Sequence, residues 1–322
     1  MTRVVVTGGT GFIGRHVLRA LAQLDTTEVL VLSRSAHAAS GRATYRQGDI
    51  GDPRGVEELV AGADIVVHLA GCKKNPGEFE ATNVEGTRNI LEACERANVR
   101  RLIYMSSVGV IGPTSEQVVT EQTPCHPANG YEQSKYAAEV MVKAFSTRRP
   151  GTTTILRPTN VFGEHDPELH LLNLIRRVKT HRFFFVGRDV SPYYVNYLYA
   201  PEIGALVVRL LASVPASDLY IVNTPTPLAA FIAAIKNLLN DPTAVGHLPF
   251  WLVKTAAVAG DRLPRALVPR PPINSLKLAE SSSRKQYSAA LLTRELPWTP
   301  AFRMEEALRN IMAHYREEGL LT

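Results

Sequence analysis

The stretch Val4-Val5-Val6-Thr7-Gly8-Gly9-Thr10-Gly11-Phe12-Ile13-Gly14 decides the fold of this chain. A short run of β-branched residues stops at a glycine-rich turn, and residues 12–24 then carry apolar side chains at helical spacing. A strand, a glycine-rich turn and a helix in this order are typical of a cradle for a dinucleotide.

Three glycines of this stretch have a predicted role in the cradle. Gly8 allows the tight turn, Gly11 lets the backbone approach a pyrophosphate, and Gly14 lets the helix pack closely on the strand. Phe12 and Ile13 begin the helix, whose unpaired N–H groups attract the phosphates. All five residues are therefore predicted to bind the cofactor.

Strands and helices alternate through the first half of the sequence, which predicts an α/β fold, a Rossmann-type doubly wound parallel sheet. Further strands are expected at 28–32, 44–47, 65–69, 101–105 and 153–156, and further helices at 56–60, 82–97 and 131–145. After residue 163 the alternation becomes irregular, with helices expected at 205–211, 228–239 and 304–315. We therefore predict a dinucleotide-binding domain at 1–163 and a smaller, mostly helical substrate-binding portion at 164–322, some of which returns to the sheet.

Composition excludes several classes of protein. The formal charge of +6 is mild, and no nucleic-acid-binding motif is present. Cys72, Cys94 and Cys125 lack zinc-site or disulfide-framework spacing, so reduced thiols and a cytoplasmic location are expected. No signal peptide, membrane span or metal site is predicted. The apolar stretch 250–260 is interpreted as a buried helix, with contact to a membrane surface as the alternative, and the proline-rich segment 263–272 as a surface excursion.

The end of the second strand favours NADP(H) over NAD(H). An acidic residue about 20 positions after the glycines binds the ribose 2′-hydroxyl of NAD, whereas an Arg accommodates the 2′-phosphate of NADP. Here Ser33 is followed by Arg34, so a guanidinium replaces the carboxylate. NAD(H) stays possible, because the alternative interpretation of Arg34 is a solvated surface cation.

Tyr131 and Lys135 are the candidate catalytic pair. Residues four apart lie on one face of a helix. An ammonium beside a phenol favours the phenolate and lowers a pKa that is ordinarily about 10. Tyr131 could then exchange a proton with a substrate hydroxyl. Ser106 and Ser107, at the end of a strand, offer a hydroxyl to hold the substrate oxygen, although such a hydroxyl can also cap a turn.

The order and spacing of these pieces resemble those of extended short-chain dehydrogenases/reductases of the NAD-dependent epimerase/dehydratase group. The resemblance rests on residues 7–14, 48–50, 68–73, 83–87, 106–112, 131–135 and 156–163, and more loosely on 296–300. It implies catalysis by Ser107, Tyr131 and Lys135, with Ser107 and Tyr131 also contacting substrate. It further implies that Asn160 binds a substrate diphosphate, and we expect a homodimer.

The same resemblance implies further cofactor contacts, with Tyr131 and Lys135 among them. Asp49 and Ile50 would flank the adenine, and Pro158 would lie near the nicotinamide. The residues that would line or support the middle of the cofactor are Leu69, Ala70, Gly71, Lys73 and Asn83.

The sequence departs from sugar-nucleotide epimerases in the segment 190–197. The Arg expected there is absent or displaced to Arg188, and the paired acids are missing. Arg265, Arg270 and Arg284 are candidates for a second substrate Arg. We expect a 4-ketoreductase or 4-epimerase acting on a nucleotide sugar. A reductase of a steroid- or flavonol-like ketone is the alternative, and a non-catalytic NADP-binding sensor is the alternative from another class.

Overall fold

The computed structural model describes residues 1–322 except 37, 39–41, 214, 263–283, 297 and 322. The chain divides into two compact units. Unit 1 comprises Met1–Pro167, Tyr197–Thr224 and Tyr287–Ala301, and unit 2 comprises Glu168–Asn196, Pro225–Gln286 and Phe302–Thr322. Unit 1 therefore includes segments from beyond the predicted boundary at residue 163, and the assignment of the later portion to substrate binding stays a prediction.

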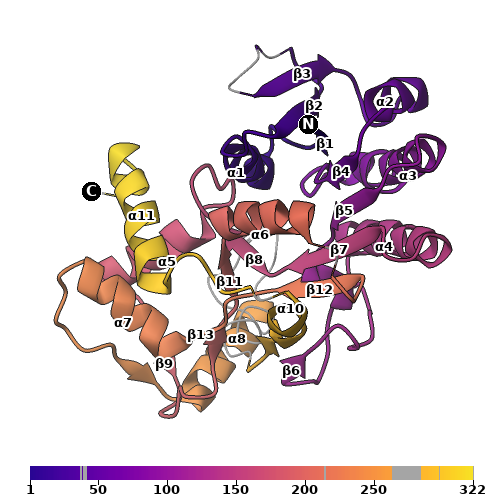
Figure 1. Cartoon of the computed structure of the whole chain (residues 1–322). Coiled ribbons are helices and arrows are strands. Elements are labelled where there is room, and N and C mark those ends of the chain that lie inside the picture. The colour runs from indigo at the N-terminus through magenta and orange to yellow at the C-terminus, as the bar shows by residue number, and fades with distance from the viewer. Residues whose placement is uncertain (37, 39–41, 214, 263–283, 297, 322) are drawn as a thin grey trace. The chain divides into compact units, whose positions relative to one another are not determined.

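Unit 1 contains a seven-stranded sheet in the order β12-β7-β5-β4-β1-β2-β3, and the strand pairs within it are parallel (Figure 1). Its strands are β1 (Thr2–Thr7), β2 (Thr27–Ser33), β3 (Ala43–Gln47), β4 (Ile65–His68), β5 (Arg101–Met105), β7 (Thr153–Pro158) and β12 (Leu219–Val222). Smaller strands are β6 (Val118–Val119), β8 (Asn160–Phe162) and β11 (Tyr197–Tyr199), while β15 (Gln286–Tyr287) spans the boundary of the units.

Unit 1 has six helices among its described residues, of which the first five lie between strands of the sheet along the chain and the last, α10, follows β15. They are α1 (Phe12–Leu21), α2 (Pro53–Val60), α3 (Gly86–Arg96), α4 (Gly130–Arg148), α6 (Ala200–Ala212) and α10 (Ala290–Glu295). Short turns of other helix types are η1 (Pro76–Glu78), η2 (Phe79–Glu85, a π-helix) and η3 (Val108–Ile111).

Alternation along β1 divides the core of unit 1 between the two faces of the sheet. Val4 and Val6 belong to a cluster with residues of α1 and α6, such as Val17 and Leu206. Val5 belongs to a second cluster with residues of α2, α3 and α4. All three valines are fully buried. Because successive strand side chains point to opposite faces, both faces of the sheet are covered. This confirms the predicted doubly wound α/β fold.

The predicted helix at 82–97 is wrong in its first turn. The chain forms the π-helix η2 from Phe79 and becomes α-helical only at Gly86. Bulges of this kind cannot be read from apolar spacing, because they depend on a local choice of hydrogen-bond partner. Asn83 lies within this π-helix and is buried. The helix predicted at 12–24 is also shorter and ends at Leu21.

Unit 2 consists of helices and short strands. The helices are α5 (His170–Lys179), α7 (Leu228–Leu238), α8 (Phe250–Arg262) and α11 (Met304–Glu317). The strands are β9 (Phe185–Val186), β10 (Tyr194–Val195), β13 (Thr226–Pro227) and β14 (His247–Leu248), with β9 paired to β14 and β10 paired to β13. The helices predicted at 205–211, 228–239 and 304–315 correspond to α6, α7 and α11.

The interpretation of residues 250–260 as a helix is correct, but the helix is not fully buried. The segment is helical, as α8, but the side chain of Trp251 is 68% exposed and that of Phe250 is 47% exposed. Apolar content alone does not reveal which face of a helix has a partner. Among the described residues, no helix combines the length and apolar character needed to cross a membrane. The proline-rich stretch 263–272 lies outside the described residues.

Candidate active site

The glycine-rich turn after β1 leaves no room for larger side chains. Gly8 has φ +71°, and a Cβ there would lie 2.6 Å from the backbone nitrogen of Ala70. A Cβ on Gly14 would lie 2.1 Å from the carbonyl oxygen of Gly8. The turn is closed by the N–H of Gly11, which donates to the carbonyl oxygen of Gly8 at 3.0 Å. The roles predicted for Gly8 and Gly14 in the turn and the helix packing therefore agree with this geometry.

The first turn of α1 has no side-chain cap. Its N-cap residue is Gly11, and no side chain accepts a hydrogen bond there. The N-terminal N–H groups of a helix have no partner within the helix and carry partial positive charge. Uncapped donors above a turn in which Gly8 and Gly14 leave no room for a Cβ form a surface that fits the diphosphate of a dinucleotide.

The predicted cofactor residues follow the carboxyl ends of neighbouring strands. Ser33 ends β2, Asp49 and Ile50 follow β3, and Pro158 ends β7. These ends meet at one edge of a parallel sheet, where open α/β folds bind their ligands. The segment holding Leu69, Ala70, Gly71 and Lys73 follows β4 and lies at the same edge, with the N–H of Ala70 donating to Thr7 Oγ1 at 3.3 Å.

Asp49 and Ile50 shape the turn that follows β3. Asp49 Oδ1 accepts a hydrogen bond from the N–H of Gly51 at 2.7 Å, which is an Asx turn. Ile50 is 8% exposed and packs on Gly86, where a Cβ would lie 2.8 Å from Ile50 Cγ2. The turn is thus held against the start of α3.

Arg34 extends into solvent after β2. Its side chain is 75% exposed, and its Nη1 lies 3.6 Å from Oε2 of Glu78, whose side chain is 43% exposed. Ser33 is buried, and its Oγ accepts a hydrogen bond from the N–H of Ser35 at 3.2 Å. An exposed ion pair of this length contributes little to stability, so the guanidinium can exchange its partner at small cost.

Lys135 is buried one helical turn after Tyr131. Its Nζ donates to the carbonyl oxygen of Met105 at 2.7 Å and lies 4.5 Å from the centroid of the Tyr104 ring. Burial lowers the pKa of the Lys135 ammonium from 10.5 to about 8, against the charge of Glu139, which raises it. The ammonium is therefore fixed in position and retains its proton at neutral pH.

Tyr131 lies in the first turn of α4 and is partly buried. Its ring lies edge-on to that of Phe79, with 6.1 Å between centroids. Its carbonyl oxygen accepts a hydrogen bond from Ser134 Oγ at 2.8 Å. The phenol ring therefore packs between the π-helix and the start of α4.

Asn83 joins the segment after β4 to this part of α4. Its Oδ1 accepts from the N–H of Cys72 at 2.7 Å, and its Nδ2 donates to the carbonyl oxygen of Cys72 at 2.9 Å and to Ser134 Oγ at 2.8 Å. A Cβ on Gly71 would lie 3.3 Å from Asn83 Oδ1 and 3.8 Å from Lys135 Nζ. The structure thus brings Gly71, Asn83 and Lys135 together, and their roles in cofactor binding stay a prediction.

Ser106 and Ser107 have different environments. Ser106 is buried, and its Oγ donates to Glu139 Oε2 at 2.6 Å. Ser107 is the N-cap of η3, and its Oγ accepts from the N–H of Gly109 at 3.1 Å. A Cβ on Gly109 would lie 3.3 Å from both Ser107 Oγ and Glu132 Cγ, so Ser107 lies near the start of α4. Of the two hydroxyls, only that of Ser107 has a proton free of the buried carboxylate.

Sequence reasoning missed a buried ion pair beneath the site. Glu139 and Arg157 are 0% and 1% exposed, and Arg157 binds both carboxylate oxygens through Nε at 3.0 Å and Nη2 at 2.5 Å. Burial opposes ionisation of Glu139, but the hydrogen bonds and charge of Arg157 hold its pKa below the usual value. Glu139 follows Lys135 by four residues, and this spacing was the available signal.

His68 is a second residue that sequence reasoning missed. It ends β4 fully buried, with Nδ1 2.7 Å from Thr7 Oγ1 and Nε2 3.0 Å from Thr87 Oγ1. Burial, together with the charge of Lys135, lowers the pKa of His68 to about 3, so the ring is neutral. It ties the ends of β1 and β4 to α3.

The residues predicted to contact substrate are only partly described. Asn160 begins β8 and is exposed. In unit 2, the guanidinium of Arg284 lies 5.8 Å from the centroid of the Tyr193 ring, within the segment that departs from the epimerase pattern. Arg188 is exposed in the same unit. Arg265 and Arg270 lie outside the described residues.

Comparisons with known proteins agree with this geometry. The sequence model of the NAD dependent epimerase/dehydratase family matches residues 4–220. The chain is 29% identical, over 86% of its length and 85% of the relative, to 4-hydroxy-2-methyl-3-oxo-4-farnesyl-3,4-dihydroquinoline-1-oxide ketoreductase of Stigmatella aurantiaca. It is 25% identical, over 98% and 97%, to N-acetyl-alpha-D-glucosaminyl-diphospho-ditrans,octacis-undecaprenol 4-epimerase of Escherichia coli O157:H7.

Among solved structures, the fold is similar to that of UDP-glucose 4-epimerase with UDP-glucose from Thermotoga maritima. The TM-score is 0.71 at 21% identity, and the match covers 98% of this chain and 99% of the other. Similarity at this level of identity supports the fold.

Proposed function

Because the chain belongs to the NAD dependent epimerase/dehydratase family, we propose that it transfers hydride at the carbon of a secondary alcohol or ketone, with Tyr131 as the acid and base. The observation that carries the proposal is the buried ammonium of Lys135, fixed by Met105 one helical turn from the phenol. Family membership supports an oxidoreductase of the extended short-chain type, and the roles of individual residues are our inference.

The glycine turn and the uncapped start of α1 fit a dinucleotide diphosphate. A bound nicotinamide ring supplies the site that accepts or donates the hydride. Gly8, Gly11 and Gly14 would hold the diphosphate together with Phe12 and Ile13, and Asp49 and Ile50 would flank the adenine. The residues we assign to the middle of the cofactor and to the nicotinamide end are Leu69, Ala70, Gly71, Lys73, Asn83, Lys135 and Pro158.

Arg34 supports a preference for NADP(H). Its exposed guanidinium follows Ser33, where NAD-binding members of this fold class place a carboxylate. A 2′-phosphate carries more charge than the Glu78 carboxylate and can displace it from Arg34. NAD(H) is the alternative. The ion pair with Glu78 favours it, because an Arg34 that stays bound to Glu78 does not bind a 2′-phosphate.

The proton is moved by the side chains of α4 and the end of β5. The ammonium of Lys135 favours the phenolate of Tyr131, which accepts the proton of a substrate hydroxyl during oxidation and returns it during reduction. Ser107 donates a hydrogen bond to the substrate oxygen and holds it against the phenol. Glu139 helps Lys135 keep its proton, because its charge raises the pKa that burial lowers.

We propose a nucleotide- or diphosphate-linked sugar as the first substrate class, for either 4-epimerisation or 4-ketoreduction. Similarity to the undecaprenyl-diphosphate sugar 4-epimerase over 98% of this chain supports it, as does the exposed Asn160 at the start of β8. The second candidate is a ring ketone of a lipophilic molecule, such as a steroid- or flavonol-like compound. Similarity to the farnesyl-dihydroquinoline-oxide ketoreductase and the absent epimerase Arg favour this candidate.

The test combines cofactor content with turnover. The purified protein is denatured and the released nucleotide is identified by chromatography; retained NAD favours epimerisation, and an empty site that binds NADPH favours reduction. A panel of nucleotide sugars, their 4-ketones and lipophilic ring ketones is then assayed with wild type and Tyr131→Phe. We expect the variant to bind cofactor within a few-fold of wild type and to lose turnover; near-normal turnover would refute the role of Tyr131.

A cytoplasmic homodimer remains part of the proposal. The absence of a membrane-crossing helix among the described residues is compatible with it. Sedimentation equilibrium of the purified chain measures the oligomeric state, and a monomer at assay concentrations would contradict the dimer.

A further inference from the structure

Helix α8 of unit 2 carries a cluster of large apolar side chains on its outer surface. Of the eight large apolar side chains that are exposed among the described residues, four belong to this helix. They are Phe250 (47% exposed), Trp251 (68%), Leu252 (44%) and Val258 (38%). Exposed apolar side chains that are scattered need no explanation, whereas a cluster on one element indicates a contact surface.

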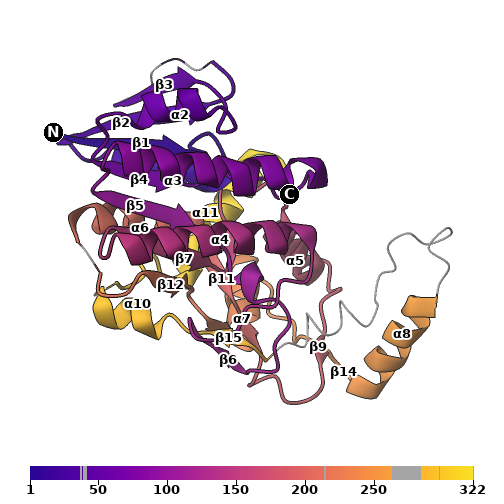
Figure 2. The same cartoon turned by 90° about the vertical axis from the view of Figure 1, so that its right-hand side faces the viewer.

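The exposed face is distinct from the face that anchors α8. Val253 and Ala257 are buried against Val186 and Leu248 of β9 and β14, and Gly260 is buried on the same side. Positions 253, 257 and 260 share one side of a helix, and positions 251 and 258 lie on the opposite side. Figure 2 shows α8 next to β14, as a rod that projects from it. The helix is thus attached by one face and presents the other to solvent.

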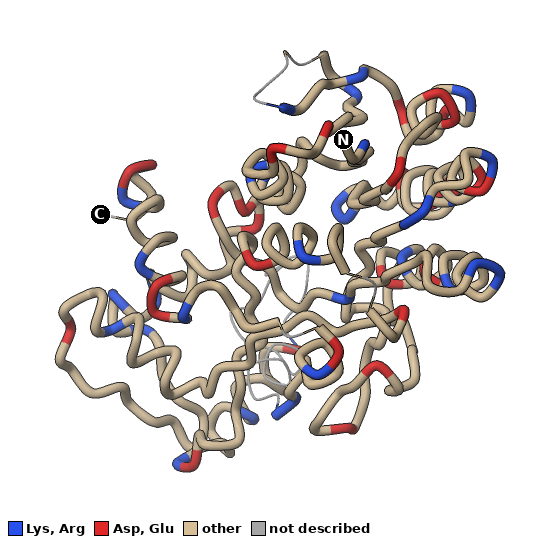
Figure 3. The backbone as a smooth tube through the Cα atoms, viewed as in Figure 1, with Lys and Arg blue, Asp and Glu red and all other residues tan. Residues whose placement is uncertain are grey.

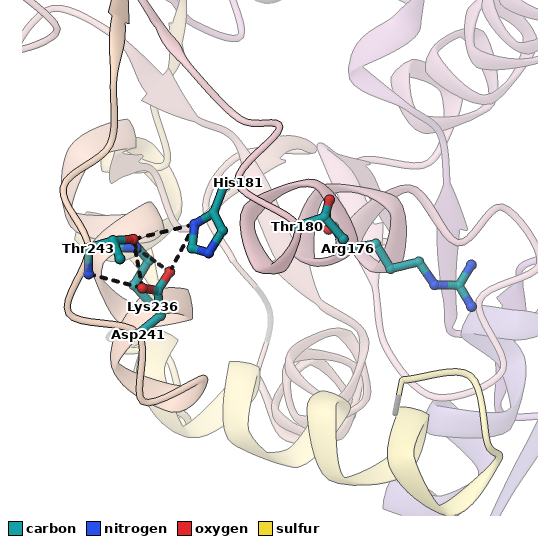
Figure 4. Close-up of polar contacts among 6 residues, drawn as sticks. All are labelled: Arg176, Thr180, His181, Lys236, Asp241 and Thr243. Atoms are coloured by element: carbon teal, nitrogen blue, oxygen red, sulfur yellow. Dashed lines mark hydrogen bonds and ion pairs between the residues drawn. The ribbon is translucent and has the colours of Figure 1, made fainter.

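A polar cluster, drawn in Figure 4, lies in the segment between α7 and β14. Lys236 of α7 forms an ion pair with Asp241 and donates to Thr243 Oγ1 at 3.0 Å. His181 Nδ1, just after α5, lies 3.8 Å from Asp241 Oδ2. These contacts fix the segment between α7 and β14, and β14 leads directly into α8.

The net positive charge of the chain belongs to unit 2. Its ranges hold 16 Lys and Arg against nine Asp and Glu, which gives +7, whereas unit 1 holds 20 against 21, which gives −1. Figure 3 shows both signs mixed along α2, α3 and α4 of unit 1. In α8, the cations Lys254 and Arg262 and one acid, Asp261, are exposed beside the apolar side chains, which gives the helix a net charge of +1. An apolar face with neighbouring cations complements a surface that is negatively charged over an apolar interior.

We propose that α8 docks unit 2 onto an anionic lipid bilayer. Trp251, Leu252 and Val258 insert between the headgroups, and Lys254 and Arg262 pair with anionic headgroups. Trp is favoured at the membrane–water interface, where its ring is apolar and its N–H is hydrated. An amphipathic helix of this kind lies in the plane of the interface. With 13 residues, α8 is too short to cross the bilayer. The proposal concerns unit 2 alone and is independent of the proposed function.

The test is flotation of the full-length chain with vesicles of phosphatidylcholine containing phosphatidylglycerol, compared with pure phosphatidylcholine. We expect binding to the anionic vesicles that weakens at high salt, because exposed charges are screened. Trp251→Ser should lower the partition coefficient about tenfold or more, since it removes most of the inserted area. Lys254→Gln should lower it about fivefold.

The matched control is Val140→Ser in α4. Its side chain is also exposed (48%) but belongs to unit 1, so its loss should leave vesicle binding unchanged. Trp fluorescence gives a second readout, because the chain has two Trp residues and Trp298 is buried. Vesicles should shift the emission of wild type to shorter wavelength, and Trp251→Phe should keep the binding and lose the shift.

The docking proposal is overturned if wild type does not float with anionic vesicles at low salt, or if Trp251→Ser binds as well as wild type. A Trp251 emission that is already blue-shifted without vesicles and is unchanged by them would mean that the chain covers its own helix. A change of the free protein from dimer to monomer in Trp251→Ser, without vesicle binding by wild type, would mean that a second copy covers it.

Discussion

Replacing Lys135 by Met should isolate the cost of burying the ammonium. The lowering of the Lys135 pKa from 10.5 to about 8 means that the buried charge lowers the free energy of unfolding by about 3 kcal/mol at neutral pH. The hydrogen bond from Nζ to Met105 and the contact with Tyr104 return part of this, about 1 kcal/mol each. We therefore expect Lys135→Met to be about 1 kcal/mol more stable than wild type at pH 7, and to lose turnover.

The pH dependence of this difference is the stronger prediction. At pH 7 the folded and the unfolded chain both hold the proton, so wild type carries the full cost. Between pH 8 and 10.5 the folded chain loses the proton and the unfolded chain keeps it, so the contribution of Lys135 to stability rises with pH. The stability advantage of Lys135→Met should fall by about 3 kcal/mol across this window and change sign.

Urea unfolding at several pH values from neutral to alkaline measures the difference directly. The control is Val140→Met on the same helix, because the side chain of Val140 is 48% exposed and the substitution removes no ionisable group. Its difference from wild type should stay constant with pH. A Lys135→Met difference that is equally constant, or that grows with pH, would refute the reasoning.

Three further predictions follow from the site. Gly14→Ala should lower the free energy of unfolding by about 1–3 kcal/mol and weaken cofactor binding, because its Cβ would lie 2.1 Å from the carbonyl oxygen of Gly8. Urea unfolding measures the stability and titration calorimetry measures the cofactor binding; unchanged values of both would contradict the prediction. Arg34→Ala should weaken NADPH binding far more than NADH binding, and Glu78→Gln should strengthen NADPH binding modestly; equal losses for both nucleotides in Arg34→Ala would remove the 2′-phosphate argument. Asn83→Ala should lower stability by about 1–3 kcal/mol and reduce turnover, because Cys72 and Ser134 lose their partner; a variant as stable and active as wild type would show that the link is dispensable.

The fold could be predicted because its first unit follows local rules closely. The run Val4 to Val6 is buried on both faces of the sheet, so it reads as a continuous apolar strand, and the glycines after it mark a turn that no larger residue fits. The predicted strand at 101–105 matches β5 at both ends. The predicted and observed elements agree where apolar residues recur at the spacing of a strand or a helix and are buried against neighbouring elements.

Other features could not be predicted, because they depend on partners distant in sequence. The Glu139–Arg157 pair joins residues 18 apart on different elements, and His68 takes its partners from β1 and α3. Glu139, Arg157 and His68 are polar or charged residues, which an amphipathic pattern would place in solvent. The sequence favoured a buried α8, because apolar side chains predict that a helix packs against something. They do not show whether the chain itself supplies that contact.

Ultraviolet difference titration of the phenols measures the proposed acid and base itself, and it requires no substrate. The chain has 11 tyrosines, and with NADP⁺ bound we expect one phenol to ionise well below the usual pKa of about 10. That phenolate signal should be absent in Tyr131→Phe and should move to higher pH in Lys135→Met. Titration curves of wild type and Tyr131→Phe that coincide at every pH below 10 would contradict the account.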